Sequence, residues 1–168
     1  LQEETGTLYH VAYPVSGQPS RTVVVATTRP ETMLGDVAVA VNPADDRYRD
    51  LVGKSVRLPI VDRDIPVIAD EYADPTFGTG VVKITPAHDA NDFEVGRRPR
   101  LTMPVVIDET AHMTEVADAD GRVPPWLAGL DRFEARDQIV EALRRSGALV
   151  KTETHRHNVG HCYRCDTV

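Results

Sequence analysis

Short runs of β-branched residues, separated by turn residues, are the feature that most constrains how this chain folds. The run RTVVVATT occupies residues 21–28, and briefer runs follow at 36–41, 54–58 and 65–69. β-Branched side chains suit a pleated, half-buried surface. Several brief strands divided by glycine, proline and aspartate are typical of a barrel or sandwich rather than of a parallel sheet. The sequence therefore predicts a mainly β domain.

The strand at 21–28 is expected to pair with the strand that precedes it. Residues 8–13 show a strand pattern, and residues 14–20, rich in glycine, proline and serine, suit the turn of a hairpin. The three consecutive valines at 23–25 show no polar–apolar alternation. A strand with that pattern is expected to be buried on both faces.

The remaining elements are a helical turn, a strand, a loop and one clear helix. One helical turn is expected at 30–35 and a further strand at 103–107, while residues 118–129 read as a Pro/Gly loop. A helix begins after Asp131, carries a repeating apolar stripe and ends at Gly147. Such a stripe indicates a scaffold helix that packs on the core.

Length and charge restrict the classes of function. The chain has 168 residues, which suits one domain with a core of its own. No apolar run is long enough to span a membrane and no signal-peptide pattern is present, so a cytoplasmic setting is expected. The formal net charge of −7 argues against a protein that coats nucleic acid electrostatically. It leaves open a pocket that grips one end of an RNA.

The stretch GTGVVKITPAHDANDFEVG, residues 78–96, carries the strongest chemical signal. Lys83 and Thr85 alternate on one face of a short strand, which a proline then ends. Asp89 and Asp92 fall in the first turn of the next helix, where the positive end of the helix favours anions. Two acids, a cation and a hydroxyl are thus expected at one strand–helix corner. Ordinary helix capping by the acids accounts for the same spacing.

A metal-dependent phosphohydrolase built on His88 and Asp89 is a competing interpretation of this corner. Such a site needs further ligands that converge from elsewhere in the chain. His10 and His112 are the only central candidates, and neither has a partner at ligand-like spacing.

The tail contains a Cys-x-x-Cys pair, Cys162 and Cys165, close to three histidines, at 155, 157 and 161. Two cysteines cannot make a disulfide framework, and their spacing points to metal or redox use. Tetrahedral zinc needs four ligands, so the pair is half of a zinc site. The favoured interpretation is that the other zinc ligands lie outside this chain. The less favoured one is that the histidines complete the site.

Three longer motifs carry a family resemblance. TTRPETMLGDVAVAVNP (27–43), FGTGVVKITPAHDANDFEVG (77–96) and GLDRFEAR (129–136) closely resemble the editing domain of valyl-tRNA synthetase, an insertion in the catalytic Rossmann fold of that class I enzyme. The match covers nearly all of the chain and keeps the order and spacing of the motifs. The sibling leucyl enzymes favour Asp where Glu31 stands. The resemblance implies a β-barrel-like fold with a few peripheral α-helices, shared by the valyl, isoleucyl and leucyl editing domains.

The resemblance also implies an activity, which is hydrolysis of the ester in mischarged threonyl-tRNA(Val). A hydrophobic pocket cannot strongly reject an isostere that adds one hydroxyl, so a second site that welcomes the hydroxyl is needed, as is known for this enzyme class. The implied partners are the CCA end of tRNA(Val) carrying threonine and, in cis, the rest of a synthetase that ligates valine to tRNA with ATP. Water is expected to attack the ester directly, without a covalent intermediate or a cofactor.

The family's acids and their neighbours match four residues that the resemblance makes catalytic. Asp92 matches the acid that binds the α-ammonium group of the misattached amino acid, and Asp89 matches a second acid that orients the substrate or the water. Lys83 is expected to steady the oxyanion or a phosphate. Thr85 offers a hydroxyl for the threonine side chain.

Five further residues are implied as substrate-binding. Thr28 offers a second hydroxyl, beside Thr27, and Arg29 is expected to grip the terminal phosphate or shape the pocket. Phe77 is placed to stack on a base of the CCA end, as aromatic side chains do with unpaired nucleotides. The fifth residue is His88, which lies between Thr85 and Asp89 in the second motif.

In this view residues 1–168 form a single editing domain excised from a larger synthetase, and residues 155–168 return toward the missing catalytic domain. The partners of Cys162 and Cys165 would then lie upstream, so zinc is expected only in the full-length enzyme and none in this fragment. Two other readings stay open: a non-catalytic module that positions the CCA end, and editing for a sibling synthetase.

Overall fold

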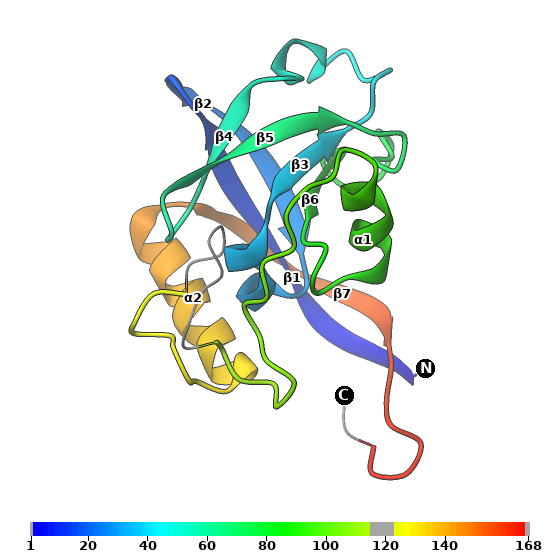
Figure 1. Ribbon diagram of the computed structural model, residues 1–168, viewed down its shortest axis with the longest axis vertical. Helices are drawn as coiled ribbons and strands as arrows, with labels where there is room; N and C mark the ends of the chain where they lie inside the picture. The colour runs from blue at the N-terminus through cyan, green and yellow to red at the C-terminus, as the bar shows by residue number, and fades with distance from the viewer. Residues whose placement is uncertain (1, 115–122, 167–168) are drawn as a thin grey trace.

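The computed structural model describes residues 2–114 and 123–166 (Figure 1). A single curled sheet dominates the structure, in the order β2-β1-β4-β5-β3-β6, with β7 paired to β1. Among the described strands, β3 and β5 pair in parallel and the other pairs are antiparallel. The strands are β1 (Gln2–Val15), β2 (Gln18–Thr27), β3 (Ala38–Val41), β4 (Ser55–Leu58), β5 (Arg63–Ala69), β6 (Val81–Ile84) and β7 (Leu149–Val159). The helices are α1 (Ala90–Arg97) and α2 (Arg132–Ser146), with 3-10 turns η1 (Pro30–Gly35) and η2 (Arg49–Leu51). The expectation of a mainly β, barrel-like domain with peripheral helices is confirmed.

The predicted hairpin forms, with Tyr9 opposite Thr27 in its register. Burial on both faces of β2 is wrong, however. Val23 and Val25 are buried, whereas Val24 between them is only half-buried. Only one face of the hairpin covers the core, so alternate residues turn outward.

Helix α2 is the scaffold helix that the apolar stripe predicts. Asp131 caps it by accepting a hydrogen bond from the Phe133 backbone N–H at 2.8 Å, and Gly147 ends it with a left-handed φ of 75°. Its buried face packs on η1. Figure 1 shows α2 on one side of the sheet and α1 on the other.

Two local expectations fail for identifiable reasons. The strand expected at 103–107 is reduced to one isolated bridge, between Ile107 and Met113. Pro104, the second residue of that segment, lacks the N–H that a ladder needs. The long strand β7 was missed because its polar sequence KTETHRHN leaves it mostly exposed, paired with β1 along its whole length. Part of the loop expected at 118–129, residues 118–122, lies outside the described residues.

The sheet brings two distant segments together. β6 pairs with the fully buried β3 and leads through Pro86 into α1, while β2 ends beside β6 at Thr27. The two ends form one corner of the barrel. Across the described ranges, no helix has the length and apolar character needed to cross a membrane.

Candidate active site

A cavity of about 250 Å³ lies where the end of β2 meets the β6–α1 corner. Asp92 and Thr28 share it, so the acid and the hydroxyl that the sequence singles out face one space. The predicted site residues that line it are Thr27, Thr28, Arg29, Lys83, His88, Asp89 and Asp92; Leu8, Ala26, Thr32, Tyr72 and Val82 complete the lining.

Asp89 is the N-cap of α1, as its spacing predicts. Its Oδ1 accepts hydrogen bonds from the backbone N–H groups of Asn91 and Asp92, at 2.8 and 3.1 Å. Capping uses one carboxylate oxygen only, and the exposed side chain also lines the cavity. Capping and substrate contact are therefore compatible for this residue.

Asp92 is a buried carboxylate at the cavity wall, with 6% of its surface exposed. Its Oδ2 accepts a hydrogen bond from the Thr85 backbone N–H at 2.9 Å. Burial raises the pKa of Asp92 to about 6, although the Thr85 N–H and the Lys83 charge oppose the shift. The site thus holds a carboxylate that is costly to ionise without a cationic partner.

Replacing Asp92 by asparagine is therefore expected to stabilise the fold at pH 8. The folded-state pKa of about 6 lies above the ordinary value of 3.8, so ionised Asp92 destabilises the fold above pH 6 by at most about 3 kcal/mol. This penalty disappears as the pH falls through 6 toward 4. Asparagine keeps an acceptor for the Thr85 N–H and carries no charge. Urea unfolding should show a gain of about 1–3 kcal/mol at pH 8 that vanishes by pH 4, and an unchanged stability at pH 8 would contradict it.

The charge of Lys83 is held by a buried network that the sequence did not reveal. Its Nζ donates to Asp36 Oδ1 and Thr32 Oγ1, each at 3.1 Å, and to Thr85 Oγ1 at 2.5 Å. Asp36 is fully buried and also accepts hydrogen bonds from the hydroxyl groups of Thr85, at 2.6 Å, and Tyr13, at 2.7 Å. Burial raises the pKa of Asp36, and the Lys83 charge and these hydrogen bonds oppose the shift. Lys83 thus contributes its charge to the cavity while its donors point into the network.

The structure does not bring the Thr85 hydroxyl to the cavity, which corrects the role expected for it. The residue is 1% exposed and its hydroxyl is engaged by Lys83 and Asp36. Its backbone N–H instead holds Asp92 in place. Thr85 thus positions the Asp92 carboxylate, and the threonines that line the cavity are Thr27, Thr28 and Thr32.

Arg29 and His88 are joined at the rim of the cavity. Arg29 Nη1 donates to the His88 carbonyl at 2.8 Å, and its Nε lies 3.5 Å from the buried carboxylate of Glu31. Arg136 from α2 grips the same carboxylate with two hydrogen bonds of 2.8 Å. This chain of contacts ties the rim of the cavity to α2.

The histidine of the motif is not arranged as a metal ligand. His88 Nε2 accepts a hydrogen bond from the Val106 backbone N–H at 3.0 Å, and burial, aided by Arg29 and Lys83, lowers its pKa to about 4. Throughout residues 2–114 and 123–166, no group of three or more His, Cys, Asp and Glu side chains is placed to hold a metal ion. Among these described residues, the phosphohydrolase interpretation lacks the additional ligands that it needs.

Phe77 and Tyr72 lie on the loop before β6, in different positions relative to the cavity. Phe77 is 72% exposed and is not part of the wall. Tyr72 does line the wall, and burial followed by the charges of Asp92 and Asp89 raises its pKa. Nothing in the sequence around Tyr72 marks it, because the loop that presents it has no regular pattern.

Cys162 and Cys165 are exposed and follow β7. Two cysteines would provide two of the four ligands that tetrahedral zinc requires. The described residues bring no third ligand to them, so the pair fits half of a zinc site and not a whole one. The origin of any remaining ligands stays a prediction.

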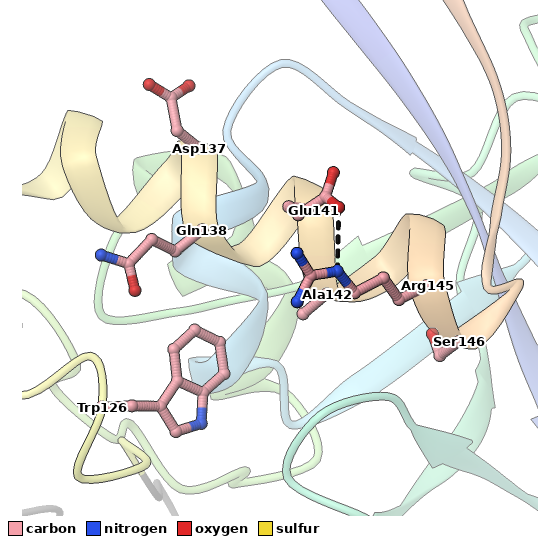
Figure 2. Close-up of a pocket in the computed structure, with 7 residues that line it drawn as sticks. All are labelled: Trp126, Asp137, Gln138, Glu141, Ala142, Arg145 and Ser146. Carbon is pink, nitrogen blue, oxygen red and sulfur yellow. Dashed lines mark hydrogen bonds and ion pairs between the residues drawn. The ribbon is translucent and has the colours of Figure 1, made fainter.

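A larger cavity, about 810 Å³, lies away from this corner on the outer face of α2 (Figure 2). Trp126 forms one wall, and Glu141 pairs with Arg145 at 2.9 Å on the other. It shares no residue with the acid-lined cavity. Size alone does not identify the site here.

Comparisons with known proteins agree with the geometry. A family model described as "Leucyl-tRNA synthetase, editing domain" matches residues 49–124. Valine--tRNA ligases from Geobacter sulfurreducens and Carboxydothermus hydrogenoformans are 58% and 60% identical to this chain, over 99% of its length, and that from Thermotoga maritima is 53% identical. The chain spans 18% of the length of these relatives.

A solved structure shows the same fold. It is the ternary complex of Agrobacterium radiobacter K84 agnB2 LeuRS with tRNA and LeuAMS, which aligns with a TM-score of 0.64 at 18% identity and covers 100% of this chain and 24% of that one. The sequence matches are consistent with the editing domain of a class I aminoacyl-tRNA synthetase, and the solved structure shares its fold. The curated relatives named above, which are 53–60% identical to it, are valine--tRNA ligases.

Proposed function

We propose that this chain hydrolyses the ester of threonyl-tRNA(Val) as the post-transfer editing site of a cytoplasmic valine--tRNA ligase. The observation that carries the proposal is the shared cavity. The buried carboxylate of Asp92 and the hydroxyl-bearing Thr28 both line it. A cationic amino group and a side-chain hydroxyl are the two groups of threonine attached to RNA that such a cavity can recognise. Valine presents only the first of these.

Asp92 binds the α-ammonium group of the misattached amino acid. Its raised pKa fits this role, because a buried carboxylate gains most from a cation that replaces lost water. Thr28 receives the threonine hydroxyl. Thr27 is less suited to that contact, since it is 8% exposed and its Oγ1 accepts the Arg29 backbone N–H at 3.0 Å. A valine in the same place would leave the Thr28 hydroxyl without a partner, at a cost of about 1–3 kcal/mol.

Hydrolysis then proceeds by direct attack of a positioned water on the ester carbonyl. Asp89 orients the water or the ribose, since one of its oxygens is free of the cap. The three donors of Lys83 point to Thr32, Asp36 and Thr85. Lys83 therefore stabilises the developing oxyanion through its charge and not through a hydrogen bond. The alcohol of the terminal ribose leaves and the amino acid departs as the free acid. The chain's residues perform each step without a bound cofactor.

A comparison of deacylation rates tests the proposal. The protein should hydrolyse threonyl-tRNA(Val) at least tenfold faster than valyl-tRNA(Val). The reason is that threonine gives the Thr28 hydroxyl a hydrogen-bond partner, whereas valine leaves it without one. The rate should resist a chelator of divalent metals. Binding without hydrolysis would instead indicate a module that only positions the CCA end. Faster hydrolysis of valyl- or isoleucyl-charged tRNA would assign the domain to a sibling specificity.

A further inference from the structure

A buried carboxylate, that of Glu31, lies between the scaffold helix α2 and the rim of the acid-lined cavity. Glu31 belongs to η1, and none of its side chain is exposed. Arg136 of α2 donates two hydrogen bonds of 2.8 Å to it, one to each carboxylate oxygen. Arg29 approaches the same carboxylate from the cavity side, with its Nε 3.5 Å from Oε1. A buried carboxylate must be paired, and here one of its two cationic partners lines the cavity.

Arg29 connects Glu31 to the turn that precedes α1. Its Nη1 donates to the His88 carbonyl at 2.8 Å, while its Nε faces Glu31. The backbone of Arg29 is fixed as well, because its carbonyl accepts hydrogen bonds from the N–H and the hydroxyl of Thr32, at 3.1 and 2.9 Å. A planar guanidinium group can bind a carbonyl with one edge and face a carboxylate with another. The Arg29 side chain is therefore held at two points.

The carbonyl that Arg29 holds belongs to the residue directly before Asp89. Asp89 begins α1 as its N-cap, and Asp92 follows in the first turn. The neighbouring groups of His88 are also engaged, since its N–H donates to the Thr85 carbonyl and its ring accepts the Val106 N–H, each at 3.0 Å. Arg29 thus restrains the peptide group at which the acidic part of the site begins.

We propose that Glu31 is a positioning residue of the editing site and that it acts through Arg29. Glu31 orients the Arg29 guanidinium group, and Arg29 in turn holds the peptide that carries Asp89 at the cavity. This rests on the proposed function, in which Asp89 orients the water or the ribose. Arg136 fixes Glu31 from α2, so a helix outside the cavity contributes to the geometry inside it. A displacement of about 1 Å in a group that orients a reactant can cost about 10²-fold in rate.

Glu31→Asp in the full-length protein tests this, because it keeps the charge and shortens the side chain by one methylene group. The longer contact, to Arg29, is the one expected to be lost. The kcat for threonyl-tRNA(Val) should fall about tenfold or more, with KM within about threefold of the parent, since Asp92 is held separately by the Thr85 N–H. Glu141→Asp, the same substitution in an exposed pair on α2, should change neither.

Substitutions at Arg29 show whether Glu31 acts through it. Arg29→Lys keeps the charge but has no planar group to serve both acceptors, so it should lose at least as much kcat as Glu31→Asp. Adding Glu31→Asp to Arg29→Lys should lower kcat by less than about twofold more, because the guanidinium group is already missing. If the two losses multiply, or if either single variant keeps the parent's kcat, the proposal is wrong. Where Glu31→Asp does not fold, Glu31→Gln keeps the length, removes the ion pair and must show the same loss.

The pKa of His88 reports the position of Arg29 without any hydrolysis. Burial and then the charges of Arg29 and Lys83 lower this pKa to about 4, and the charge of Glu31 opposes them. In the parent, exchange of the His88 ring C2 hydrogen for deuterium, followed by mass spectrometry, should be nearly constant between pH 5 and 8. In Glu31→Asp, which keeps the opposing charge and releases Arg29, the exchange rate at pH 5 should drop to about half or less of that at pH 8.

The two measurements separate this proposal from the proposed function. If the parent protein does not hydrolyse threonyl-tRNA(Val), the proposed function fails, and the exchange profile alone decides whether Glu31 positions Arg29. If the parent hydrolyses it and Glu31→Asp has the exchange profile of the parent, the proposed function stands and the role of Glu31 is refuted.

Discussion

Replacing Asp92 by alanine is expected to lower kcat/KM for threonyl-tRNA hydrolysis by a factor of about 10² or more. Removing one partner of a buried, hydrogen-bonded charge pair costs about 2–5 kcal/mol, and here the lost partner is the carboxylate that receives the substrate ammonium. The side chain is almost fully buried at the cavity wall and held by the Thr85 N–H. The substrate cation would then enter the site without its buried counter-charge.

The asparagine variant separates this effect from damage to the fold. Asp92→Asn keeps the shape of the side chain and the acceptor for Thr85, and it is expected to be more stable than the parent at pH 8. It should nevertheless lose deacylation to nearly the same extent as the alanine variant, because its amide has no charge to pair with the ammonium. Rapid deacylation by either variant would show that the ammonium binds elsewhere. Loss of activity in a stabilised protein cannot be attributed to unfolding.

The pH profile should carry the same signature. In the free enzyme kcat/KM is expected to rise with pH through about 6, where Asp92 ionises, and to fall again only as the α-ammonium group of the substrate loses its proton, at about pH 8. The pKa of His88 is lowered to about 4, so this group does not account for a transition at pH 6. Comparing the rates at pH 5 and pH 7 is sufficient to see the difference.

Much of this corner follows from the order of residues along the chain. The β-branched run, the proline and the Asp89 cap fix a strand, its end and a helix start, since each is a local preference. The Asp131 cap and the apolar stripe specify α2 in the same way. The motifs place Asp92 and Thr28 in one site by resemblance, and the structure gives them one cavity.

What escaped prediction depends on contacts between distant segments. Asp36 follows η1 and is caught between Tyr13 of β1 and Lys83 of β6, and no spacing rule relates these three residues. Thr85 looks substrate-facing by strand alternation, yet the buried carboxylate of Asp36 captures its hydroxyl. β7 was missed because an exposed polar strand has no hydrophobic period to detect. The cavity lined by Arg29, Arg132 and Arg136 arises only when β1, α2 and β7 are brought together.

Replacing Lys83 by methionine is expected to destabilise the fold by about 3–5 kcal/mol at pH 8. This is the usual cost of removing one partner from a buried ion pair, because the remaining charge is left uncompensated. Lys83 has 11% of its side chain exposed and Asp36 has none. Methionine has nearly the same length as lysine and fills the space, so little of the loss comes from a cavity.

The pH dependence and a second substitution identify the cause of that loss. Without Lys83 the pKa of Asp36, already raised by burial, must rise further, so the penalty grows as the pH rises and shrinks as Asp36 takes up a proton. Urea unfolding of Lys83→Met should therefore show a smaller loss at pH 5 than at pH 8. Adding Asp36→Asn should restore part of the stability at pH 8, whereas Lys54→Met, at an exposed pair with Asp50, should change it by less than about 0.5 kcal/mol. If Lys83→Met lowers the free energy of unfolding by less than about 1 kcal/mol, the Asp36–Lys83 pair does not hold β6 against η1. The supporting network inferred for the editing site would then have to be abandoned.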